Sequence, residues 1–351
     1  MISDRSRHKS KVRGVLNYTL SLLLTAVFLY LAFMGVDIDE VFSIVSRSSV
    51  IWIIVFVLVQ LSAHYVRALR WKVILASVKK DTSVKYLFGA LMVGYGVNCV
   101  VPRLGEVTRA VLLGKWENLS RSSMFGTVIL ERVIDVIFLG LAVLISILIF
   151  SEKLLNSFPW LQSTLYITII VIGVVIFLFY LAITQRERFY SLTVKFFSLI
   201  SGKIAHKIAT MFQMLGEGFN SLKGSKNYFF TFLLSALIMF LYALGSYIGF
   251  FIVGMQEINN VSFFMGWAVM SISAIGIVIP TPGGTGSYHT LAKSTLVLLF
   301  GFPEALSLAY AFITHAVSYI FAILISLIIF FVLNKQHDNL IKVVETEIEE
   351  L

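Results

Sequence analysis

Charged side chains interrupt three of the apolar segments of this 351-residue chain. Inside a bilayer such a charge costs about 2.5–3.5 kcal/mol unless it is paired or hydrated, so these positions are the first candidates for chemistry. Guanidinium groups hold phosphate through two parallel hydrogen bonds, and phosphate recognition is therefore the chemistry that we expect. The three groups are His64, Arg67, Arg70 and the adjoining Trp71; Arg103, Glu106 and Arg109; and Glu131, Arg132 and Asp135.

Positive charge is in excess in the second group. Arg103, Glu106 and Arg109 are spaced by three residues, which predicts that they line one side of a short helix after Pro102. Two arginines and one carboxylate leave one positive charge, beside a helix N-terminus that adds its own partial positive charge. This group is expected to bind substrate.

The other two groups have a structural alternative. Glu131 and Asp135 are four residues apart on one helix face, where, together with Arg132, they fit either a substrate site or an ion-pair network that fixes helix packing. The group that contains Arg67, Arg70 and Trp71 fits either a substrate site or an anchor at the membrane surface. Such an anchor is made of arginines that extend to the surface and an interfacial tryptophan.

A second kind of signal is a run of turn residues. Five of the seven residues from Pro280 to Gly286 are Pro or Gly, and His289 follows them. Glycine permits positive φ and close backbone approach, so the amides at Gly283, Gly284 and Gly286 are expected to point at an anion or a polar headgroup. The alternative is a tight turn in which the glycines are purely structural.

Two polar residues share a face of the last apolar segment. His315 and Tyr319 are four residues apart. We expect them to hydrogen-bond to a neighbouring helix, because a buried polar side chain in a membrane needs a partner.

The elements that must position these residues are transmembrane helices. Hydrophobic residues make up 58% of the chain and charged residues 13%. Apolar runs near the 20 residues that cross a bilayer predict an all-α, polytopic membrane bundle with six full spans. The predicted spans are 15–34, 51–69, 125–150, 164–184, 227–253 and 304–333.

Two further apolar stretches, 86–113 and 263–300, are each broken by Pro and Gly. Their second arms, 104–113 and 288–300, are too short to cross alone. We expect both stretches to be re-entrant hairpins, which gives 6–8 crossings. Irregular backbone survives in a membrane only where it is buried in protein or lines a cavity, so paired breaks point to a binding site.

The order of elements repeats. Two spans, a broken hairpin and one long span occur in 15–150 and again in 164–333, and an odd number of crossings in each half predicts an inverted repeat within one domain, 15–333. The stretch 186–222 has apolar residues at helical spacing and fits an interfacial helix or a cytosolic helix packed on the bundle.

Charge sets the predicted topology. Basic residues crowd the tail 1–14 and the segments 67–85 and 185–226, which are therefore expected in the cytoplasm, together with the polar tail 334–351. The segment 35–50 carries Asp37, Asp39 and Glu40 against Arg47 and is expected as an outside loop.

The net charge, the single cysteine and the absence of known motifs argue against nucleic-acid binding, metal binding and catalysis. The net charge of +9 reflects topology and anionic headgroups, so no nucleic-acid partner is expected. A single cysteine, Cys99, allows neither an internal disulfide nor a cysteine metal cluster. No catalytic or nucleotide-binding motif occurs, so we expect no enzyme activity, cofactor or metal, and transport that is passive or driven by an ion gradient.

At these motifs the chain resembles the transmembrane domain of the lysylphosphatidylglycerol synthase/flippase family. Four ordered stretches carry the resemblance: Arg67, Arg70 and Trp71; Pro102, Arg103, Gly105, Glu106 and Arg109; Glu131, Arg132 and Asp135; and Pro280, Pro282, Gly283, Gly284 and Gly286. In the bifunctional synthases this domain is associated with moving aminoacylated phosphatidylglycerol between leaflets, and a soluble domain attaches the amino acid. That second domain is not expected here, since a short tail follows Phe331.

The resemblance implies a multi-pass plasma-membrane protein that moves a phosphate-bearing lipid between leaflets. The candidate lipids are an anionic or aminoacylated phospholipid and a polyprenyl-phosphate-linked sugar. One alternative is a membrane glycosyl- or phosphotransferase that uses Glu131 or Asp135 as base or metal ligand, and another is a non-transporting accessory subunit. Membrane lipids are the expected partners, and a homo-oligomer or a separate lipid-modifying enzyme is left open.

Overall fold

The computed structural model describes residues 19–76, 78–159, 225–277, 279 and 281–334, together with the isolated positions 163, 166, 170, 173, 174 and 195. These residues form helices and turns, and no β-strand occurs among them. The predicted all-α class is confirmed. The expected tails 1–14 and 334–351, the span 164–184 and the interfacial helix 186–222 lie outside the described residues, apart from residue 334 and those isolated positions.

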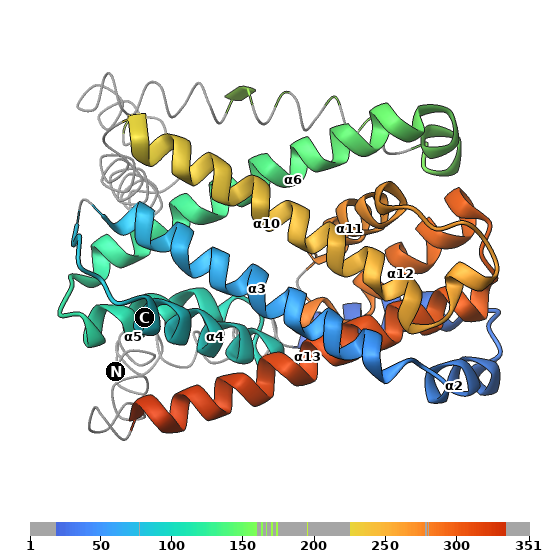
Figure 1. The fold of residues 1–351 in the computed structure, drawn as a ribbon, viewed down its shortest axis with the longest axis horizontal. Coiled ribbons are helices and arrows are strands. Elements are labelled where there is room, and N and C mark those ends of the chain that lie inside the picture. The colour runs from blue at the N-terminus through green and yellow to red at the C-terminus, as the bar shows by residue number, and fades with distance from the viewer. Residues whose placement is uncertain are drawn as a thin grey trace. The chain divides into compact units, whose positions relative to one another are not determined.

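Four described helices are long and apolar enough to cross a membrane, and they match four of the six predicted spans (Figure 1). The four helices are α3 (Val50–Leu75), α6 (Arg121–Ser157), α10 (Ser225–Ile252) and α13 (Glu304–Asn334). Apolar residues surround most of each helix, as the contact with lipid and protein requires, but α3 carries Arg67 and Arg70 on one face and α6 carries Glu131 and Asp135.

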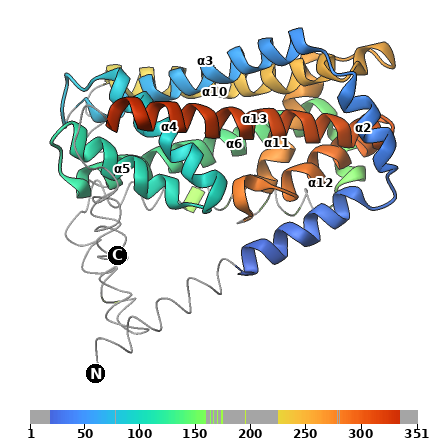
Figure 2. The same cartoon turned by 90° about the horizontal axis from the view of Figure 1, so that it is seen from below.

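The described part of the predicted first span, 15–34, is the helix Thr19–Phe33, and a second helix follows it. The helix Thr19–Phe33 meets α2 (Ile38–Ser46) at 87° (Figure 2), and counting this pair as one span gives up to five crossings in the described part of the chain. The Asp37 carboxylate caps α2 by accepting the N–H of Asp39 at 2.9 Å. The expected outside loop is therefore largely a short helix whose first turn carries the predicted acidic residues.

The first broken stretch is a helical hairpin. Helix α4 (Val84–Val100) ends at the predicted break, and α5 (Leu104–Trp116) follows it. The Gly105 N–H donates to the Asn98 Oδ1 at 2.7 Å, and a Cβ on Gly105 would collide with the Gly94 carbonyl oxygen. The rings of Tyr86 and Trp116 lie 5.8 Å apart, which joins the other ends of the two arms.

The second broken stretch is also a helical hairpin. Helix α11 (Phe263–Ile277) is followed by the short turn η2 (Pro282–Gly284), then by α12 (Ser287–Ser294) and the π-helical turn η3 (Thr295–Leu299). The arms touch at Gly276, where a Cβ would lie 2.7 Å from the Ser287 carbonyl oxygen. The two breaks are confirmed, and the re-entrant path of the hairpins stays a prediction.

The chain forms two compact units. The first comprises Met1–Leu61, Gly94–Gly105 and Leu241–Leu327, and the second comprises Ser62–Val93, Glu106–Phe240 and Ile328–Leu351. The second hairpin belongs to the first unit, whereas most of the predicted charged residues belong to the second. Each unit draws on both halves of the chain, and the inverted repeat stays a prediction.

Substituting alanine at the hairpin contacts tests this packing. We expect Gly105→Ala and Gly276→Ala each to lower the free energy of unfolding by about 1–3 kcal/mol, because the new methyl group meets backbone atoms that have little room to move. Thermal unfolding in detergent micelles measures the effect.

The matched control is Gly245→Ala in α10, where the new Cβ would lie 3.7 Å from the Phe56 ring, an ordinary contact. The higher helix propensity of alanine should leave this variant unchanged or stabilise it by up to about 1 kcal/mol. Equal behaviour of all three variants would contradict the close packing described for the hairpins.

Candidate functional site

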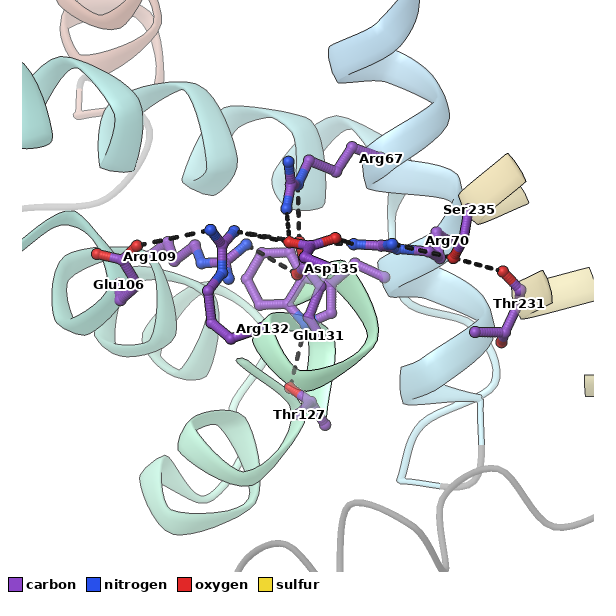
Figure 3. Close-up of polar contacts among 11 residues, drawn as sticks. Arg67, Arg70, Glu106, Arg109, Thr127, Glu131, Arg132, Asp135, Thr231 and Ser235 are labelled. Atoms are coloured by element: carbon purple, nitrogen blue, oxygen red, sulfur yellow. Dashed lines mark hydrogen bonds and ion pairs between the residues drawn. The ribbon is translucent and has the colours of Figure 1, made fainter. Parts of the chain in front are cut away.

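Three helices bring most of the predicted charged residues together in the second unit (Figure 3). Arg67 and Arg70 come from α3, Glu106 and Arg109 from α5, and Glu131, Arg132 and Asp135 from α6. The spacings of three and four residues place each set on one face of its helix, as predicted. We call these seven residues the arginine cluster.

Glu131 lies at the centre of the arginine cluster and its side chain is fully buried. Its Oε1 accepts from the Arg67 Nε at 2.8 Å and from the Arg70 Nη2 at 3.2 Å, and its Oε2 accepts from the Arg109 Nη1 at 2.8 Å. One carboxylate thus binds three buried guanidinium groups that come from two other helices.

Asp135 is the second anion of the cluster, one helical turn from Glu131. It accepts from the Arg70 Nη2 at 2.6 Å and also from the Arg67 Nη2. Arg67 and Arg70 are therefore each held by both carboxylates, a geometry that fixes the planes of their guanidinium groups.

Uncharged side chains around the cluster also contact Arg70 and Arg109. The Arg70 Nη1 donates to the Ser235 Oγ at 3.0 Å, and the Arg109 guanidinium lies 5.0 Å from the centre of the Trp71 ring. The Trp71 Nε1 donates to the Thr127 Oγ1 at 3.0 Å. The sequence analysis did not name Ser235 or Thr127, although a hydroxyl in an apolar span is itself a signal for an internal partner.

The alternative of an interfacial anchor is wrong for the first charged group. Arg70 and Trp71 are completely buried, and Arg67 is 6% exposed. Residues that extended to a membrane surface would be exposed, whereas these point into the unit and contact Glu131, Asp135 and Thr127.

The cluster has an accessible edge. The Arg132 side chain is 39% exposed and the Glu106 side chain 28%, and their closest charged atoms are 3.8 Å apart. Arg132 lies 3.5 Å from both Glu131 and Asp135. Four guanidinium groups against three carboxylates give the cluster a net charge of +1, and the exposed part of that charge is on Arg132.

Arg103 differs from its prediction. Helix α5 begins at Leu104, and Arg103 occupies the preceding turn with φ at +67°, so it does not share the helix face of Glu106 and Arg109. It is exposed and makes no hydrogen bond or ion pair with the described part of the chain. The spacing argument failed because the break extends one residue beyond Pro102.

The three glycines of the second hairpin have the predicted positive φ, but the amides of Gly284 and Gly286 do not have the predicted role. Gly283, Gly284 and Gly286 have φ of 59°, 76° and 89°, whereas Pro280 lies outside the described residues. The Gly284 N–H donates to the Thr281 carbonyl oxygen at 3.1 Å.

The amide of Gly286 also has a hydrogen-bond partner within the turn. The Gly286 N–H donates to the buried His289 Nδ1 at 3.2 Å. Because the Gly284 and Gly286 amides are satisfied within the turn, the expectation that they point at an anion is wrong. His289 caps the turn.

The last span contacts both hairpins: Tyr319 makes the predicted hydrogen bond to a neighbouring helix, whereas His315 lies against the turn η2. The His315 Nε2 lies 2.9 Å from the Gly283 carbonyl oxygen, and the Tyr319 hydroxyl donates to the Cys99 carbonyl oxygen. Within the first unit, α13 therefore contacts the break of the second hairpin and the end of α4. No group of three metal-binding side chains occurs in the part of the chain that the structure describes.

Removing the central carboxylate should destabilise the protein. We expect Glu131→Gln to lower the free energy of unfolding by about 3–5 kcal/mol, because three buried arginines would lose their shared anion. Chemical unfolding in detergent micelles measures this. Glu304→Gln is the control, since the Glu304 side chain is exposed and Lys293 keeps its hydrogen bond to the Ala32 carbonyl oxygen, so the loss should be less than about 1 kcal/mol. Equal losses in the two variants would contradict the central role of Glu131.

Comparisons with known proteins agree with this architecture. Residues 18–326 match the family model described as the lysylphosphatidylglycerol synthase TM region. A UPF0104 membrane protein of Methanocaldococcus jannaschii is 20% identical over 92% of this chain and 96% of its own length, and one of Pyrococcus horikoshii is 25% identical over 80% and 87%.

A third UPF0104 membrane protein, from Methanothermobacter thermautotrophicus, is 28% identical over 40% of this chain and 42% of its own. No solved structure matches the chain significantly. The family match covers the arginine cluster and both hairpins, and it agrees with the apolar helices long enough to cross a membrane. This chain is a multi-pass membrane protein that belongs to the lysylphosphatidylglycerol synthase TM region family.

Proposed function

We propose that this protein moves a phosphate-bearing lipid between the leaflets of the plasma membrane and that the arginine cluster binds the lipid phosphate. The observation that carries the proposal is Arg132, a partly exposed guanidinium at the edge of a buried cluster with a net charge of +1. An anion at this edge would neutralise the excess charge, and a guanidinium holds phosphate with two hydrogen bonds.

The buried part of the cluster supports this role by being rigid. Arg67, Arg70 and Arg109 are fixed by Glu131 and Asp135, so a ligand at Arg132 meets an ordered positive surface. Groups that are already oriented lose little entropy when they bind, which favours affinity. The anion is expected to approach Arg132 and to displace Glu106, whose contact with Arg132 is the longest in the cluster at 3.8 Å.

The membrane setting supports a lipid as the source of the phosphate. The family model is named after the synthase of lysylphosphatidylglycerol, an aminoacylated phospholipid. An anionic or aminoacylated phospholipid and a polyprenyl-phosphate-linked sugar all present a phosphate next to apolar chains. From the charge pattern we expect both termini and the arginine cluster on the cytoplasmic side. We propose a transporter, not an enzyme, with membrane lipids as partners.

Lipid exchange in proteoliposomes tests the proposal. Fluorescent phosphatidylglycerol, its lysyl form and a polyprenyl-phosphate lipid are followed by dithionite reduction of the outer-leaflet label. We expect Arg132→Gln to slow exchange of the transported lipid by about 10–100-fold. This factor corresponds to the free energy lost when a hydrogen bond to a charged group is removed.

The control is Lys85→Gln, which removes the same charge from an exposed position at the start of α4. It should exchange lipid at the rate of the unmodified protein, and both variants should unfold at the same temperature as that protein. Exchange by Arg132→Gln at the unmodified rate would contradict phosphate binding at the cluster edge.

Changing the competing carboxylate should have the opposite effect. We expect Glu106→Gln to lower the lipid concentration for half-maximal exchange by about three- to fivefold, because the anion no longer displaces a charged partner of Arg132. A titration of the lipid mole fraction in the same vesicles measures this. A higher half-maximal concentration would show that Glu106 assists binding and does not compete with it.

A further inference from the structure

An open cavity of about 530 Å³ lies in the first unit, between the segments 40–52, 251–258 and 303–306. Trp52 and Phe251 give it an aromatic wall, and Glu40, Arg47 and Glu257 give its lining a charge of −1. These three charged residues are exposed, so water hydrates them without any ligand. A pair of histidines in the same unit is better shielded and is the stronger candidate for a function.

His289 of α12 and His315 of α13 form this pair. Their ring centres lie 4.7 Å apart, beside the turn of the second hairpin. The His315 Nε2 donates to the Gly283 carbonyl oxygen at 2.9 Å, whereas the His289 Nδ1 accepts from the Gly286 N–H. Two imidazoles from two helices therefore hold one turn, one as a donor and the other as an acceptor.

His315 keeps one ring nitrogen for a further partner. Its Nδ1 makes no hydrogen bond within the part of the chain that the structure describes, and its side chain is partly exposed, whereas His289 is 4% exposed. Because the Nε2 already donates, the neutral ring has its lone pair on Nδ1. A proton from water can bind to that lone pair without loss of the bond to Gly283.

The pair accommodates one proton, not two. A second positive charge on a ring 4.7 Å away would be repelled by the first. The Nδ1 of His289 is also engaged with the Gly286 N–H, which leaves His315 as the residue that binds the proton.

No carboxylate contacts His315 among the described residues. The ionisable groups that face it are His289, Tyr288, whose ring is stacked on it at 5.4 Å, and Tyr319, whose ring lies at 5.6 Å. A proton on His315 therefore has no fixed negative charge beside it.

The other elements around the pair add no charge either. Neither α11 nor η2 contains an ionisable residue, and Lys293, further along α12, is paired with Glu304 at 2.8 Å. The remaining helices approach this part of α12 and α13 with uncharged groups: Gln60 of α3, the Cys99 carbonyl oxygen of α4, Gly249 of α10 and the Phe28 carbonyl oxygen.

We propose that His315 is a proton-binding site and that its proton couples the movement of the lipid to a proton gradient. An ionisable residue in a membrane span is costly to keep charged, so one without a fixed counter-charge is suited to take up and release its proton. The inference rests on the proposed function and deepens it by naming the driving ion.

Protonation changes how firmly α13 holds the second hairpin. The added proton makes the bond from Nε2 to the Gly283 carbonyl oxygen charge-assisted, and the positive ring then faces the π-surface of Tyr288. Loss of the proton to water leaves a bond between neutral groups, which is about half as strong. Each transition between a firmly and a loosely held hairpin therefore binds or releases one proton.

The distribution of lipid between leaflets under a pH gradient tests the coupling. Proteoliposomes with a difference of one pH unit across the membrane contain fluorescent phosphatidylglycerol, its lysyl form or a polyprenyl-phosphate lipid. Dithionite then reports the labelled fraction in the outer leaflet. With one proton per lipid, we expect a leaflet ratio of up to about tenfold. Protein-free vesicles give the background.

The variant His315→Gln separates the proton from the hydrogen bond. The glutamine amide can still donate to Gly283, but it binds no proton. We expect this variant to exchange lipid and to leave equal amounts in the two leaflets. Tyr319→Phe is the control, because it removes the bond from α13 to the Cys99 carbonyl oxygen and keeps His315. It should still accumulate lipid in one leaflet.

Imidazole nitrogen shifts detect the proton without any lipid movement. The full chain, labelled with ¹⁵N-histidine in nanodiscs, is titrated between about pH 5 and pH 8, the range in which histidine changes its charge. The signals that disappear in His315→Gln assign the residue. We expect His315 to take up one proton in this range and His289 to keep the shifts of a neutral ring.

Two results would overturn the inference: no titration of His315 in that range, or accumulation by His315→Gln equal to that by the unmodified protein. Exchange by the unmodified protein that ends with equal leaflets also removes the coupling, but it leaves the proposed function intact. Titration of His315 in a protein that moves none of the three lipids removes the proposed function and leaves a proton site without that role.

Discussion

The ion pairs of Glu131 determine where α3, α5 and α6 can meet. Removing a guanidinium from water costs several kcal/mol, and three such groups are buried around this one carboxylate. Their burial is compatible with a stable protein only when the three helices approach closely enough to share the anion. These ion pairs also fix the rotation of each helix about its own axis. Rotating α3 or α5 would move its arginines away from Glu131, and rotating α6 would move Glu131 itself. The ion pairs of one carboxylate thus determine how three helices of the second unit pack.

The arginine cluster and the cavity of the first unit differ in sign and in the type of contact they offer. The arginine cluster has formal charges that are mostly neutralised internally, with the remainder at Arg132. The cavity offers an aromatic wall and a small negative charge.

Local patterns in the sequence predicted a large part of this structure. The apolar runs predicted four of the described helices, and the Pro/Gly breaks predicted both hairpins. Spacings of three and four residues predicted that Arg67 and Arg70, and likewise Glu131 and Asp135, share helix faces. These inferences succeed because they depend on periodicity within one helix.

Contacts between distant segments could not be predicted in the same way. Nothing local distinguishes a buried Trp71 from an interfacial tryptophan, since its burial depends on Thr127 and Arg109. The turn geometry that places Arg103 outside α5 depends on the exact end of the break. The cavity was also missed, because its wall combines the distant segments 40–52, 251–258 and 303–306.

The hydrogen bond between the Gly286 N–H and the His289 Nδ1 has a consequence for the tautomer of that histidine. A ring nitrogen that accepts a hydrogen bond carries no proton, so the imidazole is neutral and its proton is on Nε2. A positively charged imidazole has no lone pair and would face the Gly286 amide with a second donor. The turn of the second hairpin is thus compatible only with an uncharged His289. One hairpin of this membrane protein contributes ion pairs to the arginine cluster, whereas the other depends on the absence of charge.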